Sequence, residues 1–138
     1  MSAADRKRPR MRLDSICLDC TWDQLDEMIA FYQALLDWPP DTEDEGMVSA
    51  LLGPGVSLSF QPVTSYQPPT WPSEVRGKQI HLDIVVDDLV EAVEYARSIG
   101  AQDASAQYGD TWFVMLDPAG HPFCLTLNAL MPEHQEGV

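Results

Sequence analysis

The chain has 138 residues, 45% of them hydrophobic, which suits one globular domain with a sizeable core. No stretch approaches about eighteen consecutive apolar residues, and the polar, basic N-terminus lacks the apolar segment of a secretory signal, so we expect no membrane partner and a cytoplasmic protein. The formal charge of −14 is uneven, because from residue 13 onward three basic residues stand against twenty-one acidic ones, a formal charge of −18 that would repel phosphate backbones and excludes nucleic acid as a partner.

The first predicted elements are a strand at residues 15–20 and a helix that begins at Leu25. Apolar residues recur in the helix at steps of three and four, which is the pattern of a helix with one buried face. A Pro-Pro pair at residues 39–40 forbids its continuation. Two strands are predicted at residues 47–52 and 56–63 across a Gly-Pro-Gly turn, whereas an acidic run fills the region before them and shows no clear strand.

Residues 64–78 are rich in proline and carry Tyr66 and Trp71, so we expect a linker or a loop that covers a pocket, with Trp71 as its lid. A second helix is predicted from Leu89, and Gly100 ends it as a capping glycine would. Three further strands follow, the last two joined by an Asp-Pro-Ala-Gly turn. They are predicted at residues 102–107, 111–116 and 122–128.

The two halves of the chain repeat each other. Residues 16–19 (Ile-Cys-Leu-Asp) match residues 80–83 (Ile-His-Leu-Asp) at a shift of 64, and the residues before each helix match at the same shift. The last strands of the two halves align at a shift of 65, which matches Ser59 with Cys124. Each half therefore reads strand, helix, strand, strand, strand, which predicts an α+β domain built from two similar units.

Three cysteines, Cys17, Cys20 and Cys124, are an odd number in a chain without a secretion signal, which argues against a disulfide framework. Cys17 and Cys20 have the spacing of a redox or zinc pair. However, side chains three residues apart on a strand point to opposite faces, so we expect that these two thiols do not meet.

Three motifs resemble the glyoxalase/bleomycin-resistance/dioxygenase proteins, the vicinal-oxygen-chelate (VOC) superfamily, and in particular the glyoxalase-like proteins common in actinobacteria. The motifs are Phe31-Tyr-x-x-Leu-Leu-x-Trp38, Gln79-Ile-His-Leu-Asp-Ile-Val-Val-Asp-Asp-Leu89 and Leu116-Asp-Pro-Ala-Gly-His-Pro-Phe-Cys-Leu125. The resemblance implies two βαβββ modules that form a curled mixed sheet around a cup, and it implies homodimers. The expected domain (13–128) has a first module (13–63), a linker (64–78) and a second module (79–128). From their composition we expect a disordered basic tail before it (1–12) and a polar tail after it (129–138).

In the metal-dependent relatives, four ligands come from equivalent strand positions of the two modules, usually His, Gln or Glu on the first strand and Glu on the last. The resemblance places these positions at Cys17, Ser59, His81 and Cys124. Only His81 agrees, and both carboxylates are missing, so we expect neither ordinary divalent-metal chemistry nor a cofactor. A zinc site of Cys17, His81 and Cys124 remains an alternative, because zinc accepts sulfur and nitrogen ligands. Against it, free cysteines most often pack in cores.

Strand alternation puts Asp83 on the face of His81, and Asp19 on the face of Cys17. A carboxylate close to His81 would favour its protonated form, so His81 and Asp83 are a candidate acid–base pair near neutral pH, although a histidine merely satisfied by its neighbour is the plainer alternative. Two aspartates in a cavity with aromatic walls would attract a cationic ligand. The expected ligand-binding residues are Cys17, Asp19, Ser59, Gln61, Trp71, Trp112 and Cys124. We expect His121 at the rim, in a turn.

These patterns favour a small-molecule-binding protein that sequesters a cationic or aromatic metabolite or antibiotic. The alternative is a lyase, isomerase or hydrolase of the VOC type with His81 as acid–base, with or without zinc. A regulatory or interaction module that uses the fold only as a scaffold is the third hypothesis, and it predicts no well-formed cavity.

Overall fold

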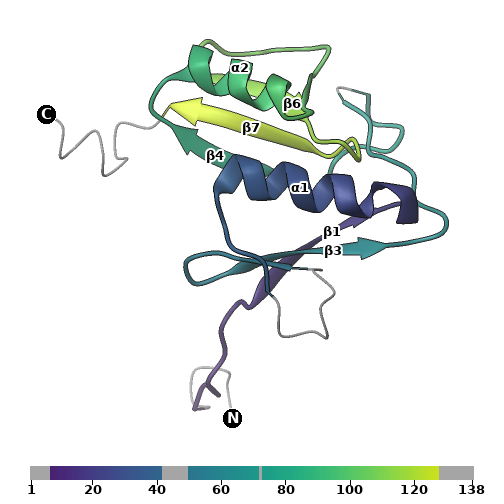
Figure 1. Ribbon diagram of the computed structural model, residues 1–138, viewed down its shortest axis with the longest axis vertical. Helices are drawn as coiled ribbons and strands as arrows, with labels where there is room; N and C mark the ends of the chain where they lie inside the picture. Colours follow the sequence, from purple (N-terminus) through teal and green to yellow (C-terminus); the bar gives the residue numbers. More distant parts are fainter. Residues whose placement is uncertain (1–6, 42–49, 72, 128–138) are drawn as a thin grey trace, which may run out of the picture.

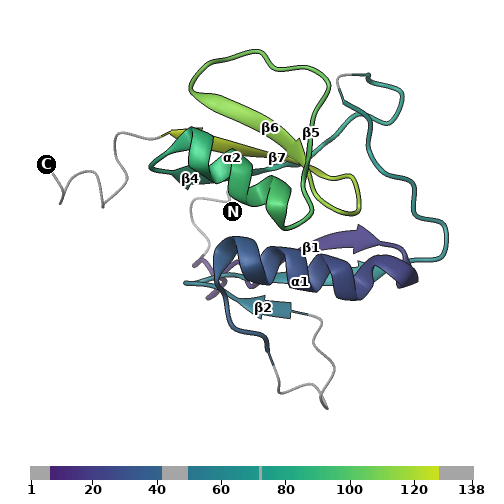
Figure 2. The same ribbon diagram turned by 45° about the horizontal axis from the view of Figure 1, so that its top comes forward.

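The computed structural model describes residues 7–41, 50–71 and 73–127 of the chain. Backbone pairing over these residues gives two small sheets, each with a helix (Figures 1 and 2). The expectations for the first half of the basic tail, for the start of the strand predicted at 47–52 and for the polar tail at 129–138 fall outside the described residues.

The first module is a three-stranded sheet with the order β1-β3-β2, in which β1 runs parallel and β2 antiparallel to β3. Its elements are β1 (Ser15–Cys20), the 3-10 helix η2 (Trp22–Gln24), α1 (Leu25–Leu36), β2 (Ala50–Leu52) and β3 (Ser57–Pro62). Along β1 the side chains alternate between an exposed face with Cys17 and a helix-facing side that ends at the fully buried Cys20. The two thiols thus lie on opposite faces, as expected, because the side chains of a strand alternate.

Within the described residues, the strand that the sequence does not show between α1 and β2 is present as a single bridge. Pro40 pairs with Leu51, and two backbone hydrogen bonds flank the bridge: Leu52 N–H donates to the Pro39 carbonyl at 2.8 Å, and Asp41 N–H donates to the Ala50 carbonyl at 2.9 Å. A proline has no N–H to donate, so the Pro-Pro pair supports pairing only through its carbonyls and at a sheet edge. The described part of this pairing, at a Pro-Pro pair, therefore leaves no alternating pattern in the sequence.

The second module repeats this arrangement with four strands in the order β4-β7-β6-β5. Its elements are β4 (Leu82–Val86), α2 (Leu89–Ser98), β5 (Gln102–Asp103), β6 (Trp112–Leu116) and β7 (Pro122–Leu127). β5 ends well before residue 107, where we predict its end. The side-chain amide of Gln107 takes over the pairing, because its Oε1 accepts from Val114 N–H and its Nε2 donates to the Val114 carbonyl, both at 2.8 Å.

The α+β class and the duplicated βαβββ plan are thus confirmed, with one correction to the alignment of the halves. Cys17 pairs with Ser59 across β1 and β3, whereas Cys124 pairs with Asp83 across β4 and β7. On the ladder Asp83 therefore takes the place of Cys17, and His81 lies two residues earlier. The predicted match is off by two residues, which still keeps each side chain on its predicted face because the strand repeat is two.

One apolar core holds the two modules together. α1 lies between the two sheets (Figure 1), and its aromatic residues contact both: the Phe31 ring lies 5.8 Å from that of Phe123 on β7, and the Tyr32 ring 5.9 Å from that of Phe60 on β3. Buried residues of both modules form a single cluster around these rings. No helix in the described part of the chain is long and apolar enough to cross a bilayer.

Candidate functional site

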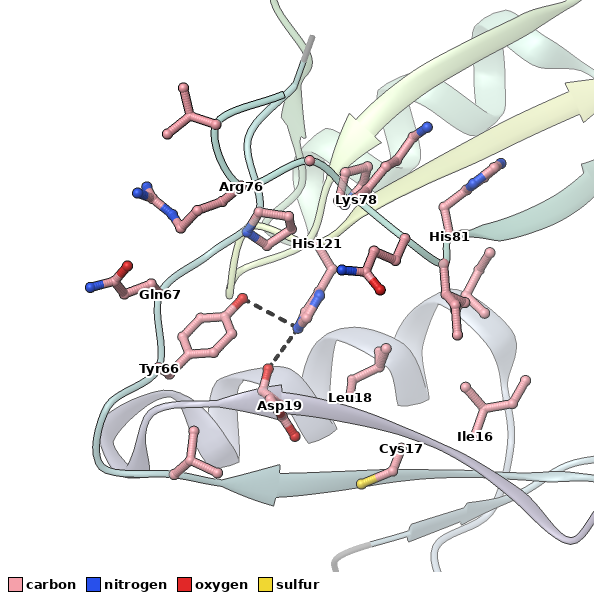
Figure 3. Close-up of a pocket in the computed structure, with 18 of the residues that line it drawn as sticks. Ile16, Cys17, Leu18, Asp19, Tyr66, Gln67, Arg76, Lys78, His81 and His121 are labelled. Carbon is pink, nitrogen blue, oxygen red and sulfur yellow. Dashed lines mark hydrogen bonds between the residues drawn. The ribbon is translucent and has the colours of Figure 1, made fainter. Parts of the chain in front are cut away.

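An open groove of about 980 Å³ lies between β1 and the segment that leads into β4 (Figure 3). Residues of β1, of the linker, of the segment 74–82 and of the turn before β7 line it, and a volume of this size accommodates a small organic molecule. The lining residues with polar or charged groups of interest are Asp19, Tyr66, Arg76, Lys78, His81 and His121.

His121 ties the two modules together on the wall of the groove (Figure 3). Its Nε2 lies 2.6 Å from the backbone carbonyl oxygen of Asp19 on β1, so Nε2–H donates there. The Tyr66 hydroxyl donates to the Ala119 carbonyl at 2.6 Å, and its oxygen lies 3.3 Å from the same imidazole nitrogen. Burial is the main reason that the pKa of Tyr66 is raised, so its hydroxyl stays a donor at neutral pH. The predicted rim residue is thus a joint between β1, the linker and the turn before β7.

The turn that carries His121 is organised by a buried carboxylate. Asp117 is 3% exposed, and its Oδ1 accepts from the N–H groups of Ala119 and His121, both at 2.9 Å. Its Oδ2 accepts from the Tyr32 hydroxyl of α1 at 2.6 Å. Burial raises the pKa of Asp117, and these hydrogen bonds oppose the rise. Gly120 completes the turn with a φ of 90°, where a Cβ would come within 2.8 Å of Pro68.

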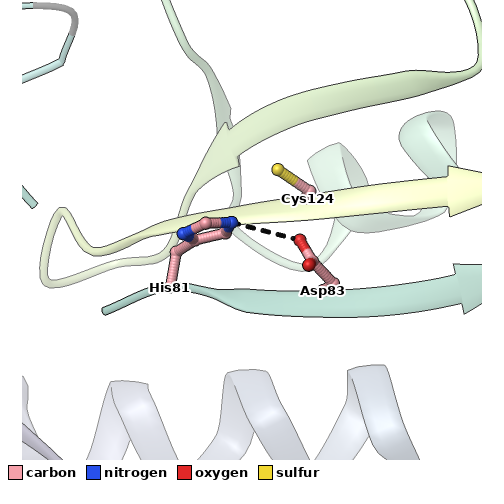
Figure 4. Close-up of side chains that lie close together, drawn as sticks. All are labelled: His81, Asp83 and Cys124. Carbon is pink, nitrogen blue, oxygen red and sulfur yellow. Dashed lines mark ion pairs between the residues drawn. The ribbon is translucent and has the colours of Figure 1, made fainter. Parts of the chain in front are cut away.

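His81, Asp83 and Cys124 form a compact cluster on the face of the second sheet that points away from α2 (Figure 4). Their candidate ligand atoms all lie within 4.8 Å of one another, and His81 Nε2 is 3.3 Å from Asp83 Oδ1. The His81 side chain is 36% exposed and reaches the groove, whereas Cys124 is buried. The predicted acid–base pair is therefore in contact, next to a thiol.

This cluster offers the donor set of a zinc site with an open position. Imidazole nitrogen, carboxylate oxygen and thiolate sulfur are all zinc ligands, and catalytic zinc keeps three protein ligands and a free fourth position. Burial first, and then the charge of Asp83, raises the pKa of Cys124, so a metal would have to displace the thiol proton. Cys17 does not belong to the group among the described residues. The structure therefore brings together two members of the predicted zinc set and adds Asp83 in place of the third.

Trp71 of the linker lies against the same face of the second sheet. Its ring packs on a small cluster of Ala104, Val114 and Cys124, and its Nε1–H donates to the Ala106 carbonyl at 3.2 Å. The ammonium group of Lys78 lies 4.0 Å from the centroid of the Trp71 ring. Trp71 thus covers part of the face that carries the His81 cluster, but it is not among the residues that line the groove, so its role as a lid stays a prediction.

The other predicted ligand-binding residues divide between the groove and its surroundings. Cys17 and Asp19 line the groove from β1. Ser59 pairs with Cys17 but is not among the lining residues, and Gln61 is exposed further along β3. Trp112 begins β6 and covers Gly109, where an added Cβ would meet its ring at 2.3 Å. The four positions 17, 59, 81 and 124 therefore lie as two pairs on two sheets.

Sequence reasoning missed Arg76 and Lys78, both of which line the groove. They are two of the three basic residues beyond residue 13. The charge imbalance could therefore have pointed to these residues. Two of the few basic residues of an acidic domain lie in one short segment, which marks a locally positive part of its surface.

Comparison with known proteins agrees with this architecture. A family model described as a glyoxalase-like domain matches residues 15–126, which is most of the chain. No curated protein sequence matched.

Solved structures share the fold at low sequence identity. A glyoxalase-related enzyme from Fulvimarina pelagi is 16% identical, with 88% of this chain and 91% of that one covered and a TM-score of 0.63. A fosfomycin resistance protein from Listeria monocytogenes is 17% identical, with coverages of 91% and 97% and a TM-score of 0.63. A lactoylglutathione lyase from Agrobacterium tumefaciens is 17% identical, with coverages of 89% and 98% and a TM-score of 0.56.

Proposed function

Because the chain belongs to the glyoxalase-like domain family of the VOC superfamily, we propose that it binds a small organic molecule in the groove between β1 and residues 74–82. The observation that carries the proposal is the groove itself, whose lining brings the polar groups of Asp19, Lys78 and His81 to one hollow. A hollow with few and well-placed polar groups is the usual form of a small-molecule site. It also argues against a pure scaffold, which needs no hollow.

The lining gives weak support to a cationic ligand, the class that the sequence favours. That expectation depends on aspartates facing the cavity, and Asp19 does line the groove. However, Arg76 and Lys78 line it too, so the carboxylates do not dominate the charge there. Binding of an organic metabolite or antibiotic, in the sense of sequestration, needs only the groove and is our first candidate function.

Acid–base catalysis at His81 is the second candidate, favoured by the 3.3 Å contact between His81 Nε2 and Asp83 Oδ1. Asp83 supplies a counter-charge when the imidazole takes up a proton, and it fixes the orientation of the ring. Since His81 also borders the groove, its ring can hold or release a proton beside a bound molecule. Such a pair suits a lyase, isomerase or hydrolase, and one structural neighbour is named a lyase.

A metal is compatible with this second function but is not needed for it. His81, Asp83 and Cys124 would hold a zinc ion, and Asp83 would then act as a ligand instead of as a counter-charge. Bound zinc would polarise a carbonyl oxygen or lower the pKa of a bound water.

The proposal is tested by filling the groove. Gln79→Trp places a large side chain on the groove wall, and Gln61→Trp makes the same change at an exposed position of β3 outside the lining. Saturation-transfer NMR with a library of small organic compounds is expected to find ligands of the wild type that Gln61→Trp retains and Gln79→Trp loses. Retention of every ligand by Gln79→Trp, or a library without a single ligand, would contradict the proposal. Selective loss in Gln61→Trp would move the site to the open face of the first sheet.

A further inference from the structure

We propose that the groove selects a small organic anion, and that the ammonium group of Lys78 binds the carboxylate or phosphate group of this ligand. The inference rests on the proposed function, because it takes the groove as the binding site, and it names the class of ligand.

The distribution of cations is the first observation. Beyond residue 13 the chain has three basic residues against twenty-one acidic ones. Arg97 is neutralised on the surface, since its Nε and one terminal nitrogen donate to the two carboxylate oxygens of Asp103 at 2.8 and 2.7 Å. The other two, Arg76 and Lys78, both line the groove, and within the described residues neither forms an ion pair. The uncompensated cations of an acidic body thus gather at one hollow.

The setting of Lys78 is the second observation. Its Nζ lies 4.0 Å from the centroid of the Trp71 ring, and Trp71 is itself fixed by packing on the second sheet and by its hydrogen bond to Ala106. An aromatic face attracts the charge of an ammonium group but accepts few of its three N–H donors. The ammonium group is therefore held in place while N–H groups stay available to an oxyanion, which takes charge-assisted hydrogen bonds best.

The position of Lys78 relative to His81 is the third observation. The Trp71 ring that holds the Lys78 ammonium group packs on the small cluster that contains Cys124, which places Lys78 on the face of the second sheet that carries His81. Cys124 in turn lies within 4.8 Å of His81. A ligand whose acid group contacts Lys78 would therefore present its neighbouring atoms to the imidazole. This arrangement joins recognition of an anion to a proton-transfer group.

Opposing charges do not cancel this attraction. Asp19 and Glu74 also line the groove, and the body as a whole is acidic. Exposed charges are screened over about 8 Å at physiological salt, so carboxylates elsewhere on the body act weakly on a bound ligand. A direct contact with Lys78 is screened far less, because bound ligand and protein exclude water and salt from it.

The test uses the fact that the full chain has two lysines, Lys7 and Lys78. Both are acetylated with a soluble acetyl ester, and mass spectrometry follows the rate at each. The ligands are benzoate, phenyl phosphate, benzamide and benzyltrimethylammonium, which share a ring and differ in charge. At a concentration ten times the dissociation constant, benzoate or phenyl phosphate is expected to slow acetylation of Lys78 about tenfold and to leave Lys7 unchanged. The two anions distinguish a carboxylate from a phosphate site.

Substitutions complete the test. By NMR titration, Lys78→Met is expected to weaken binding of the preferred anion by about tenfold or more, the effect of losing a charge-assisted hydrogen bond, and Lys7→Met to leave it unchanged. Equal protection of Lys78 by the cation or by benzamide would overturn the anion inference and leave the groove as the site. Equal affinity of the two lysine variants would overturn the assignment to Lys78. Failure of all four compounds to bind would count against both proposals.

Discussion

Replacing Tyr32 by Phe removes the hydroxyl group that α1 donates to Asp117, in the turn that carries the groove residue His121. The hydroxyl donates to Asp117 Oδ2 at 2.6 Å, and both side chains are buried, so water has no access to replace it. The N–H groups of Ala119 and His121 still bind the other carboxylate oxygen, so the turn is expected to persist. A hydrogen bond to a charged group contributes about 1.5–3 kcal/mol. We therefore expect a loss of about 2 kcal/mol in the free energy of unfolding at pH 7, and roughly 6 °C in Tm.

The loss should depend on pH. Burial raises the pKa of Asp117 above its ordinary value of 3.8, and the bond from Tyr32 opposes this, so Tyr32→Phe raises the pKa further. An acid with a raised pKa in the folded state contributes stability that is present below its unfolded pKa and is lost as the pH rises through its folded pKa. The variant loses more of this stability by neutral pH. The difference from the wild type is therefore largest at neutral pH and shrinks toward pH 3.8.

Urea unfolding followed by circular dichroism measures this difference at each pH, and carboxylates common to both proteins cancel in it. Tyr95→Phe is the matched control, because the Tyr95 hydroxyl donates to the Ala34 carbonyl at 3.0 Å but the side chain is 49% exposed. Its loss should stay within about 0.5 kcal/mol. A Tyr32→Phe variant that is no less stable than Tyr95→Phe, or whose loss is the same at every pH, would refute the reasoning.

Two further predictions concern the cluster at His81. Asp83→Asn is expected to lower the zinc affinity of chelator-treated protein by about tenfold or more, and Cys17→Ser to leave it unchanged, as measured by isothermal titration calorimetry. A loss of affinity in Cys17→Ser but not in Asp83→Asn would favour the zinc set expected from the sequence. A wild type that binds no zinc would remove zinc from the mechanism. His81→Gln is expected to abolish turnover of any substrate found for the groove. The Tm of this variant should stay within about 2 °C of the wild type, since the side chain is partly exposed. A much lower Tm would instead show a structural role for His81.

The elements that local patterns predict best are β1 and α1. Their bounds agree with the predicted strand at 15–20 and with a helix that begins at Leu25, because an apolar stripe and a Pro-Pro stop are both signals within a few residues. The strand predicted at 102–107 is shorter because the side chain of Gln107 replaces backbone pairing. Local sequence patterns do not show when a side chain takes over the hydrogen bonds of a strand.

The candidate site shows the same division. The contact of His81 with Asp83 follows from alternation along one strand, and the sequence predicts it. Asp83, and not Cys17, joins His81 and Cys124 in the cluster because of the register between β4 and β7, which pairs Asp83 with Cys124, 41 residues later in the chain. A gapless alignment of the two halves does not fix that register. The cations of the groove come from the segment before β4, whose position relative to β1 is set by the joint at His121. Such tertiary placement leaves no periodic trace in the sequence.

The position of α1 between the sheets makes the duplicated halves inseparable. Its ring residues Phe31 and Tyr32 contribute to the interior on both sides, so neither half encloses an apolar centre by itself. If the chain were cut within the linker, each fragment would expose apolar surface, and the fragments would be prone to associate instead of folding. The sequence thus repeats one unit twice, but the two units share one core. We therefore expect the whole domain to unfold cooperatively in a single transition.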